Sequence, residues 1–121
     1  MQPKKITVRK DRKSLEIDFG NNELFEFSAE VLRVLSPSAE VQGHSPEQRK
    51  TVGGKRDVGI MSMEPVGNYA VRITFDDMHN TGIFSWSYFH DLGQNLEEKW
   101  ESYLAELEEK GLSREPQVFR S

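Results

Sequence analysis

The chain contains no cysteine. Disulfide bonds, thiolate catalysis, cysteine-ligated zinc and cysteine-held iron–sulfur clusters are therefore excluded. Long apolar runs are also missing: none approaches the roughly 20 residues of a membrane-spanning helix, and the N-terminus lacks the apolar centre of a signal peptide. We expect a cytoplasmic protein without a membrane partner.

Apolar residues are scarce as well, at 36% of the 121 residues, whereas 30% are charged. Seven Phe, three Tyr and two Trp nevertheless supply more aromatic volume than a disordered chain carries. The length is typical of one domain, with a core expected at about residues 5–110 and a flexible tail at residues 111–121.

Positive charge is in the minority, and the net charge of −4 makes a nucleic-acid partner unfavourable. The two signs are segregated along the chain, with basic residues gathered at residues 4–13 and acidic residues at residues 97–109. This distribution either orients a partner or gives two separately solvated faces.

A hairpin followed by a helix is predicted near the N-terminus. Residues 14–27 alternate apolar and polar side chains around a Gly-Asn-Asn turn at residues 20–22. Ser28 can then cap a short helix over residues 29–35, and another strand is expected at residues 6–9.

The same order recurs further along the chain. Residues 71–84 alternate around a turn at residues 76–79, Ser85 can cap the helix that follows, and a strand is expected near residues 58–63. The two copies align as Ile17-Asp18-Phe19 with Ile73-Thr74-Phe75 and Phe27-Ser28 with Phe84-Ser85, with one extra residue in the second turn. We interpret them as an internal repeat.

A C-terminal amphipathic helix completes the expected fold. Its apolar side recurs at helical spacing in Leu96, Trp100, Leu104 and Leu107, which we interpret as core. Asn95 and Glu98 form a capping-box pattern, and Gly111 ends the helix. The predicted class is α+β, a small β-sheet built from two hairpin-plus-helix units with a C-terminal amphipathic helix.

The stretch over residues 43–57 is polar and basic and shows neither helical nor strand periodicity. Its cations could hold an anion or an acidic partner, although a mobile solvated loop explains the same composition. Gly53-Gly54-Lys55-Arg56 lacks both the first glycine and the final Ser or Thr of a phosphate-binding loop.

Catalytic and metal motifs are weak. Ser36 or Ser38 could be combined on paper with His79 and with Asp76 or Asp77 as a hydrolase triad, but no nucleophile-elbow motif marks either serine. The histidines lack paired metal-ligand spacing. We assign no catalytic residue, no metal and no cofactor.

Two stretches carry a specific resemblance, Phe27 to His44 and Gly67 to Tyr88, together with Gly54-Lys55-Arg56-Asp57 between them. Over about residues 10–110 the chain resembles the gamma-butyrobetaine-hydroxylase-like N-terminal domain family, a domain of unknown function. The resemblance implies a small α+β fold. It also implies three settings: a module of iron- and 2-oxoglutarate-dependent carnitine-pathway hydroxylases, a tail on iron–sulfur carrier ATPases, and stand-alone bacterial proteins such as this one.

In the hydroxylases of that family the domain holds a structural zinc through three cysteines and a histidine. By motif, the resemblance places these ligands at Ser36, Ser38, Val41 and His79, so three of the four are replaced here. We expect no such zinc in this chain, and the hydroxylase activity belongs to a catalytic domain that these residues do not contain.

The leading functional prediction is a non-enzymatic interaction or accessory module that binds an unidentified protein. Its candidate surface comprises Ser36, Ser38, Glu40, His44, Arg49, Lys55, Arg56, Asp57 and Trp86. The alternative is an accessory role in iron–sulfur cluster assembly or metal delivery, with an iron–sulfur carrier as partner. An unrecognised enzyme would need a pocket where His79 meets Asp76 and Asp77.

Overall fold

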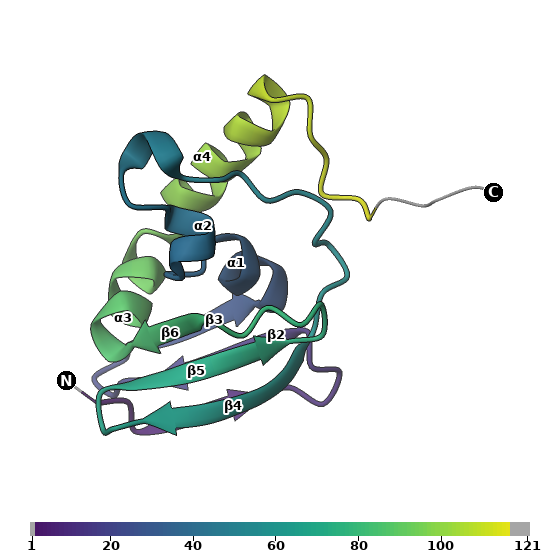
Figure 1. Cartoon of the computed structure of the whole chain (residues 1–121). Coiled ribbons are helices and arrows are strands. Elements are labelled where there is room, and N and C mark those ends of the chain that lie inside the picture. Colours follow the sequence, from purple (N-terminus) through teal and green to yellow (C-terminus); the bar gives the residue numbers. More distant parts are fainter. Residues whose placement is uncertain (1, 117–121) are drawn as a thin grey trace.

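The structure, a computed structural model, describes residues 2–116 (Figure 1). Its elements in chain order are β1 (Lys5–Val8), β2 (Ser14–Asp18), β3 (Leu24–Ser28), α1 (Ala29–Val34), α2 (Ala39–Gln42), the 3-10 helix η1 (Pro46–Gln48), β4 (Ile60–Val66), β5 (Ala70–Phe75), β6 (Gly82–Ser85), α3 (Trp86–Gln94) and α4 (Leu96–Glu109). The predicted α+β class is confirmed. No helix in this part of the chain is long and apolar enough to span a membrane.

The strands form two three-stranded antiparallel sheets, in the orders β1-β2-β3 and β4-β5-β6. Each unit thus forms a sheet of its own, where the sequence led us to expect one small sheet built from both. The predicted strands before the two hairpins are present as β1 and β4. The described chain therefore contains two copies of a β-β-β-α unit, with α2 and η1 between them and α4 after the second.

The strand registers of the two units agree. Ile17 pairs with Phe25 in the first sheet, and Ile73 pairs with Gly82 in the second, which places the predicted extra residue in the second turn. Gly82 leaves room for the Ser36 side chain, because an added Cβ would meet the Ser36 hydroxyl. The repeat thus has matching backbones and different side chains at equivalent positions.

Serine caps start the helix of each unit directly after its last strand. Ser28 Oγ accepts a hydrogen bond of 3.0 Å from the Val31 amide, and Ser85 Oγ accepts one of 3.1 Å from the Tyr88 amide. Each hydroxyl satisfies one of the amide donors that a helix start leaves without an intrahelical acceptor. Both predicted caps are confirmed.

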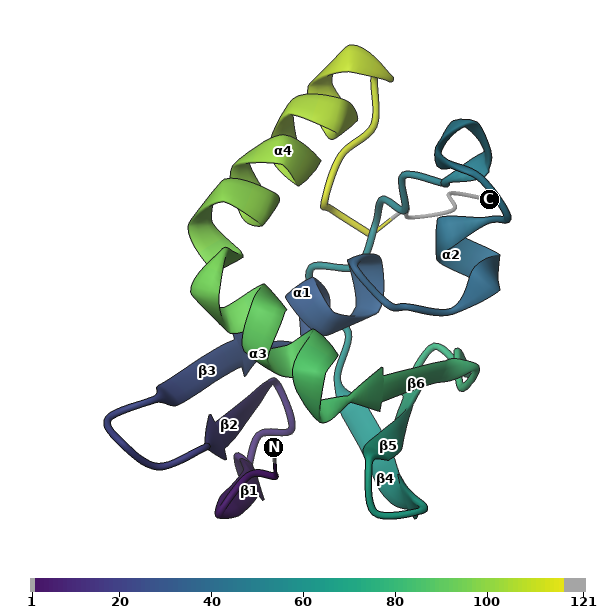
Figure 2. The same cartoon turned by 90° about the vertical axis from the view of Figure 1, so that its left-hand side faces the viewer.

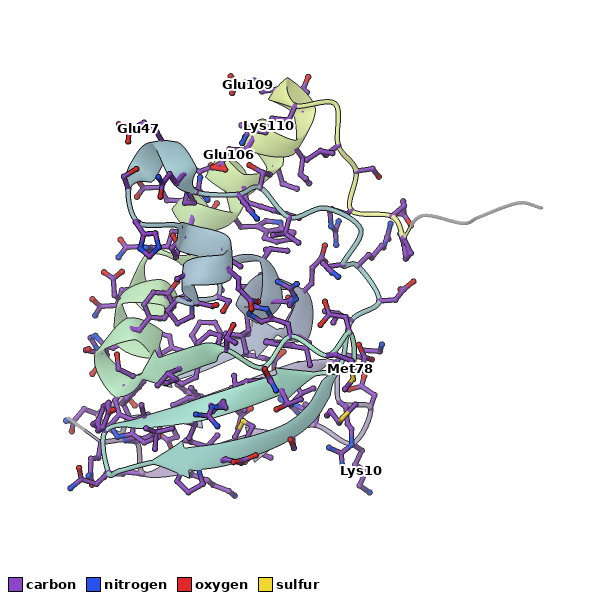
Figure 3. The ribbon with its side chains drawn as sticks, in the orientation of Figure 1. Lys10, Glu47, Met78, Glu106, Glu109 and Lys110 are labelled. Carbon is purple, nitrogen blue, oxygen red and sulfur yellow. The ribbon has the colours of Figure 1, made fainter. Side chains whose placement is uncertain are left out.

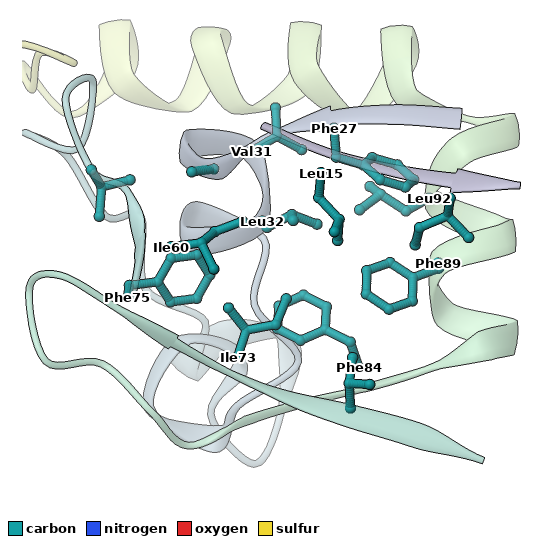
Figure 4. Close-up of a cluster of buried hydrophobic side chains, with 14 of the residues drawn as sticks. Leu15, Phe27, Val31, Leu32, Ile60, Ile73, Phe75, Phe84, Phe89 and Leu92 are labelled. Atoms are coloured by element: carbon teal, nitrogen blue, oxygen red, sulfur yellow. The ribbon is translucent and has the colours of Figure 1, made fainter. Parts of the chain in front are cut away.

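The main core lies where the two sheets and the helices α1 and α3 meet, and both units contribute to it (Figures 2 and 4). Its fully or nearly fully buried members include Leu15, Ile17, Phe27, Leu32, Ile60, Ile73, Phe75, Phe84, Phe89 and Leu92. Burial of each such side chain contributes roughly 1.5–3 kcal/mol. The Phe84 and Phe89 rings stack with their centroids 5.3 Å apart, which joins β6 to α3.

Helix α4 is attached through a second, smaller cluster of Val34, Tyr103 and Leu107, against which Trp100 packs. Two details of the prediction for this helix are wrong. Leu104 is 37% exposed, and the buried position beside it is Tyr103. No capping box forms: the Asn95 side chain donates to the Asp91 carbonyl, and it accepts no hydrogen bond from an amide of α4.

The 43–57 stretch and the C-terminal segment are held to the body of the molecule by backbone hydrogen bonds. Lys50 N donates to Val41 O at 2.7 Å, and Gly54 N and Arg56 N donate to the carbonyls of Ser113 and Arg114 at 2.8 and 3.0 Å. Helices α2 and η1 were not predicted. The segment expected as a flexible tail makes these contacts up to Arg114, and residues 117–121 lie outside the described residues.

Replacing Ser85 with alanine should lower the free energy of unfolding by about 1 kcal/mol, because the Tyr88 amide loses its acceptor. Urea titration followed by circular dichroism measures the change. Ser102→Ala is the matched control: Ser102 is exposed in the middle of α4, and alanine favours a helix interior. Equal losses in both variants would contradict the capping role.

Candidate functional site

A hydrogen-bonded chain of three polar side chains links the end of α1 to the β5–β6 turn. His79 is 6% exposed; its Nε2 lies 3.0 Å from Ser36 Oγ, and its Nδ1 lies 3.1 Å from Glu40 Oε2. The arrangement resembles a serine–histidine–carboxylate relay. Its carboxylate is Glu40, and not Asp76 or Asp77 as the sequence suggested.

Burial argues that this relay is structural. Ser36 is fully buried, and its hydroxyl also accepts a hydrogen bond of 3.2 Å from the Ser38 amide. Neither Ser36 nor His79 lines the groove beside α4 or the two smaller cavities near residues 51–58 of the described chain. A nucleophile needs an accessible reacting atom and a substrate space beside it, and this hydroxyl has neither.

The residues at the relatives' zinc positions do lie together, but they do not fit a zinc ion. Ser38 Oγ lies 2.5 Å from Thr81 Oγ1, Val41 is 1% exposed and apolar, and His79 is the single nitrogen donor. Within residues 2–116 no group of three or more His, Cys, Asp or Glu side chains is placed to hold a metal. A polar network occupies this place instead.

Asp77 is the charged centre of the same region. Its carboxylate accepts from Arg33 Nε at 2.7 Å, from Lys55 Nζ at 2.6 Å and from the His79 amide at 3.1 Å. Burial alone would raise the pKa of Asp77, but these donors outweigh it and lower that pKa to about 2. Burial and the nearby Arg33 charge lower the pKa of His79, which favours the neutral ring.

Three of the four cations of the 43–57 stretch, all but Lys50, pair with carboxylates of the described chain. Arg49 pairs with Glu106, Lys55 with Asp77, and Arg56 with Glu115. These pairs tie residues 43–57 to α4, to the β5–β6 turn and to the C-terminal segment. They leave little positive charge here for an acidic partner.

The residues of the predicted binding surface are consequently spread over several places. Ser36 and Ser38 are buried, whereas Glu40, His44 and Asp57 are exposed. Trp86 is the first residue of α3. Its Nε1 donates a hydrogen bond of 2.9 Å to the Asn68 carbonyl in the β4–β5 turn, so this donor already has an acceptor within the domain.

A groove of about 590 Å³ lies on the helical side of the molecule. Its walls are the segment after α1 and the helices α3 and α4, and Figure 2 shows α2 and α4 on opposite sides of α1. The lining residues are Leu35, Pro37, Gln42 and Arg49 on one side, and Tyr88, Asp91, Asn95, Glu98, Lys99, Ser102, Tyr103 and Glu106 on the other.

Both tyrosines of the groove are fixed in place. The Tyr88 hydroxyl donates to the Leu35 carbonyl and the Tyr103 hydroxyl to the Val52 carbonyl. Burial is the main cause that raises the pKa of each to about 12, so both hydroxyls stay protonated. Two neutral tyrosine rings, each held by a hydrogen bond from its hydroxyl, therefore line the groove.

Among the described residues, one unpaired carboxylate, Glu98, lines the groove, and further exposed glutamates lie elsewhere on α4. Lys99 pairs with Asp91 at 3.2 Å, whereas the exposed glutamates of α4 make no ion pair within residues 2–116. These glutamates are Glu97, Glu98, Glu101, Glu108 and Glu109. Figure 3 shows Glu109 at the far end of α4 from the sheets.

The sequence prediction did not name the groove, although α4 carried a signal for it. Glu98, Ser102 and Glu106 recur at four-residue spacing, so they share one side of the helix with Tyr103. The opposite wall contains Arg49, the one groove residue that belonged to the predicted surface. Arg49 is held in this wall by its ion pair with Glu106, a residue distant in sequence.

The fold agrees with what the comparisons show. A family model described as gamma-butyrobetaine hydroxylase-like, N-terminal, matches residues 6–90. The chain belongs to this family. The match concerns the N-terminal domain, so the hydroxylase reaction is not carried over to this gamma-butyrobetaine hydroxylase-like N-terminal domain. None of the curated proteins matches the chain.

Solved structures resemble this family member closely. Two proteins solved in solution by NMR have TM-scores of 0.82 and 0.80 and sequence identities of 41% and 42%. The first alignment covers 98% of this chain and 93% of the relative, and the second covers 99% and 89%. A crystal structure at 1.93 Å from Acidithiobacillus ferrooxidans, of a protein with unknown function, has a TM-score of 0.63 and 35% identity over 76% of this chain and 92% of that one.

The Asp77 cluster should make stability depend on pH at the acid end. Because the pKa of Asp77 falls from 3.8 to about 2 on folding, the unfolded chain binds the proton more readily. The stabilisation, about 2 kcal/mol, is present above a pH of about 4 and is lost as the pH falls through about 2.

This dependence is measured by urea titrations of the native chain and of Asp77→Asn between about pH 5 and pH 2. The gap in unfolding free energy between the two should close by about 2 kcal/mol over that range. Asp76→Asn is the control, since Asp76 is the exposed neighbour. A gap that stays constant for Asp77→Asn would contradict the assignment.

Proposed function

We propose that this domain is a non-enzymatic protein-interaction module that receives a basic segment of its partner in the groove beside α4. The observation that carries the proposal is the pairing of charges. Three of the four cations of the 43–57 stretch, all but Lys50, pair with carboxylates of the described chain, whereas Glu98 in the groove and the other exposed glutamates of α4 pair with no cation there.

The walls of the groove suit an amphipathic partner. Leu35, Pro37 and the two tyrosine rings offer apolar contact, while Asn95 and Glu98 offer polar contact at the edge. Binding sites of this kind combine an apolar floor with a few placed polar groups. A partner segment with one apolar side and Lys or Arg on the other matches this distribution.

The alternative, an accessory role in iron–sulfur assembly or metal delivery, would have to act through a protein partner. The described residues offer no cluster of metal ligands, and the chain has no cysteine. Under this alternative the partner would itself be an iron–sulfur carrier. The same capture experiment therefore serves both readings.

The test compares Glu98→Lys with Glu64→Lys in affinity capture from the native host. Glu64 is exposed on β4, away from the groove, so the two variants change the net charge equally. We expect a specific partner to be retained by the native chain and by Glu64→Lys, and lost from Glu98→Lys. Mass spectrometry of the retained proteins measures this.

The outcome against the proposal is equally clear. A partner that both variants retain, or that both lose, would show that the groove is not where it binds. Capture of an iron–sulfur carrier would identify the accessory role, and its dependence on Glu98 would place that role at the groove.

A further inference from the structure

The segment after α4 folds back along the molecule and is called here the C-terminal strap, residues 112–116. Gly111 turns the chain with a φ of +66°, and the Leu112 amide donates to the Leu107 carbonyl at 2.8 Å. Figure 1 shows the strap descending from the end of α4 beside the segment that precedes β4. Backbone hydrogen bonds join the two stretches at Gly54 and Arg56.

One side chain of the strap enters a slot in the domain. Arg114 donates from Nε and Nη2 to the two carboxylate oxygens of Glu30, at 2.8 and 2.7 Å. Its guanidinium also lies 5.2 Å from the centre of the Trp100 ring. A planar fork, a carboxylate and an aromatic face together select arginine over lysine.

The slot is incomplete without an arginine. Glu30 is 5% exposed in the first turn of α1, and within residues 2–116 Arg114 is the sole side chain that pairs with it. A buried carboxylate that loses its partner is strongly unfavourable. The domain therefore presents a built receptor for a guanidinium group, and its own strap supplies the occupant.

The backbone beside the slot is shaped for an extended peptide. The Gly54 and Arg56 amides, two residues apart, donate to successive carbonyls of the strap. Gly53 permits the approach, because a Cβ there would lie 2.8 Å from the Ser113 carbonyl oxygen. Main-chain hydrogen bonds to an extended segment, with one side chain in a pocket, form a recurring mode of peptide recognition.

The strap is held by few contacts besides the slot. Leu112 is 43% exposed, and the Arg56–Glu115 pair lies at the surface, where an ion pair stabilises little. A terminal segment with so little buried apolar surface opens at lower cost than the core unfolds. Arg114 is thus the main attachment of a segment that can be displaced.

We infer that the slot formed by Glu30, Trp100 and the backbone of residues 53–56 binds an extended, arginine-containing peptide of a partner protein, and that the C-terminal strap is its resident competitor. The inference rests on the proposed interaction role and adds a second contact site with a stated ligand. The glutamates of α4, which lie on the helix that carries Trp100, favour the same basic partner.

The test uses the full chain and a fluorescent peptide with the sequence of residues 111–116, Gly-Leu-Ser-Arg-Glu-Pro, which contains the strap. Fluorescence anisotropy should show at least about tenfold tighter binding to Arg114→Ala than to the native chain, whose own strap competes. Peptides with Lys or Ala in place of Arg should bind at least about tenfold more weakly. Arg9→Ala, which removes an exposed arginine away from the slot, should behave like the native chain.

Equal binding to the native chain and to Arg114→Ala, no binding to either, or binding that does not need the arginine would overturn the inference. Because Arg114→Ala exposes a buried carboxylate and can fail to fold, a second measurement uses the native chain alone. The Gly54 and Arg56 amides should exchange hydrogen at least about 100-fold faster than the Ile73 amide of the core. Equal protection would mean that the strap does not open, and the inference would be wrong.

The two proposals fail separately. Loss of the captured partner from Glu98→Lys with no peptide binding would leave the groove proposal standing and reject the slot. If the peptide binds and Glu98→Lys still captures the partner, the slot proposal stands and the groove proposal is rejected.

Discussion

The fold depends on the burial that two small units provide for each other. A three-stranded sheet has one apolar face that must be buried against another layer, and one short helix covers only part of it. Here Leu15, Ile17 and Phe27 of the first unit meet Ile73 and Phe84 of the second in one core. The positions of the helices, the groove and the polar network all follow from that shared core.

Local signals were sufficient for much of the architecture. The alternation of apolar and polar residues predicted the strands of both hairpins, and Ser28 and Ser85 predicted where the helix of each unit begins. These features are encoded within a few residues, so they can be recognised without knowing which segments meet. The family resemblance independently predicted a small α+β fold, and the match of the family model to residues 6–90 confirms the resemblance.

Contacts between distant residues were not predictable in the same way. Arg114 and Glu30 are 84 residues apart, and Ser36 and His79 are 43 apart. Neither pair follows a periodicity, so only the folded chain shows that Glu40, and not an aspartate of the turn, faces His79. Likewise, the basic loop could be interpreted as a free surface until its ion pairs were known.

The different residues at equivalent positions of the two sheets have a consequence for the symmetry of the molecule. Phe25 fills its place with a ring that lies against Gly93, whereas Gly82 leaves a notch that the Ser36 hydroxyl enters. Both contacts join the two units, one through an aromatic ring and the other through a hydroxyl that reaches His79. A duplicated backbone thus yields an asymmetric molecule, because equivalent positions of the two hairpins meet the opposite unit through different chemistry.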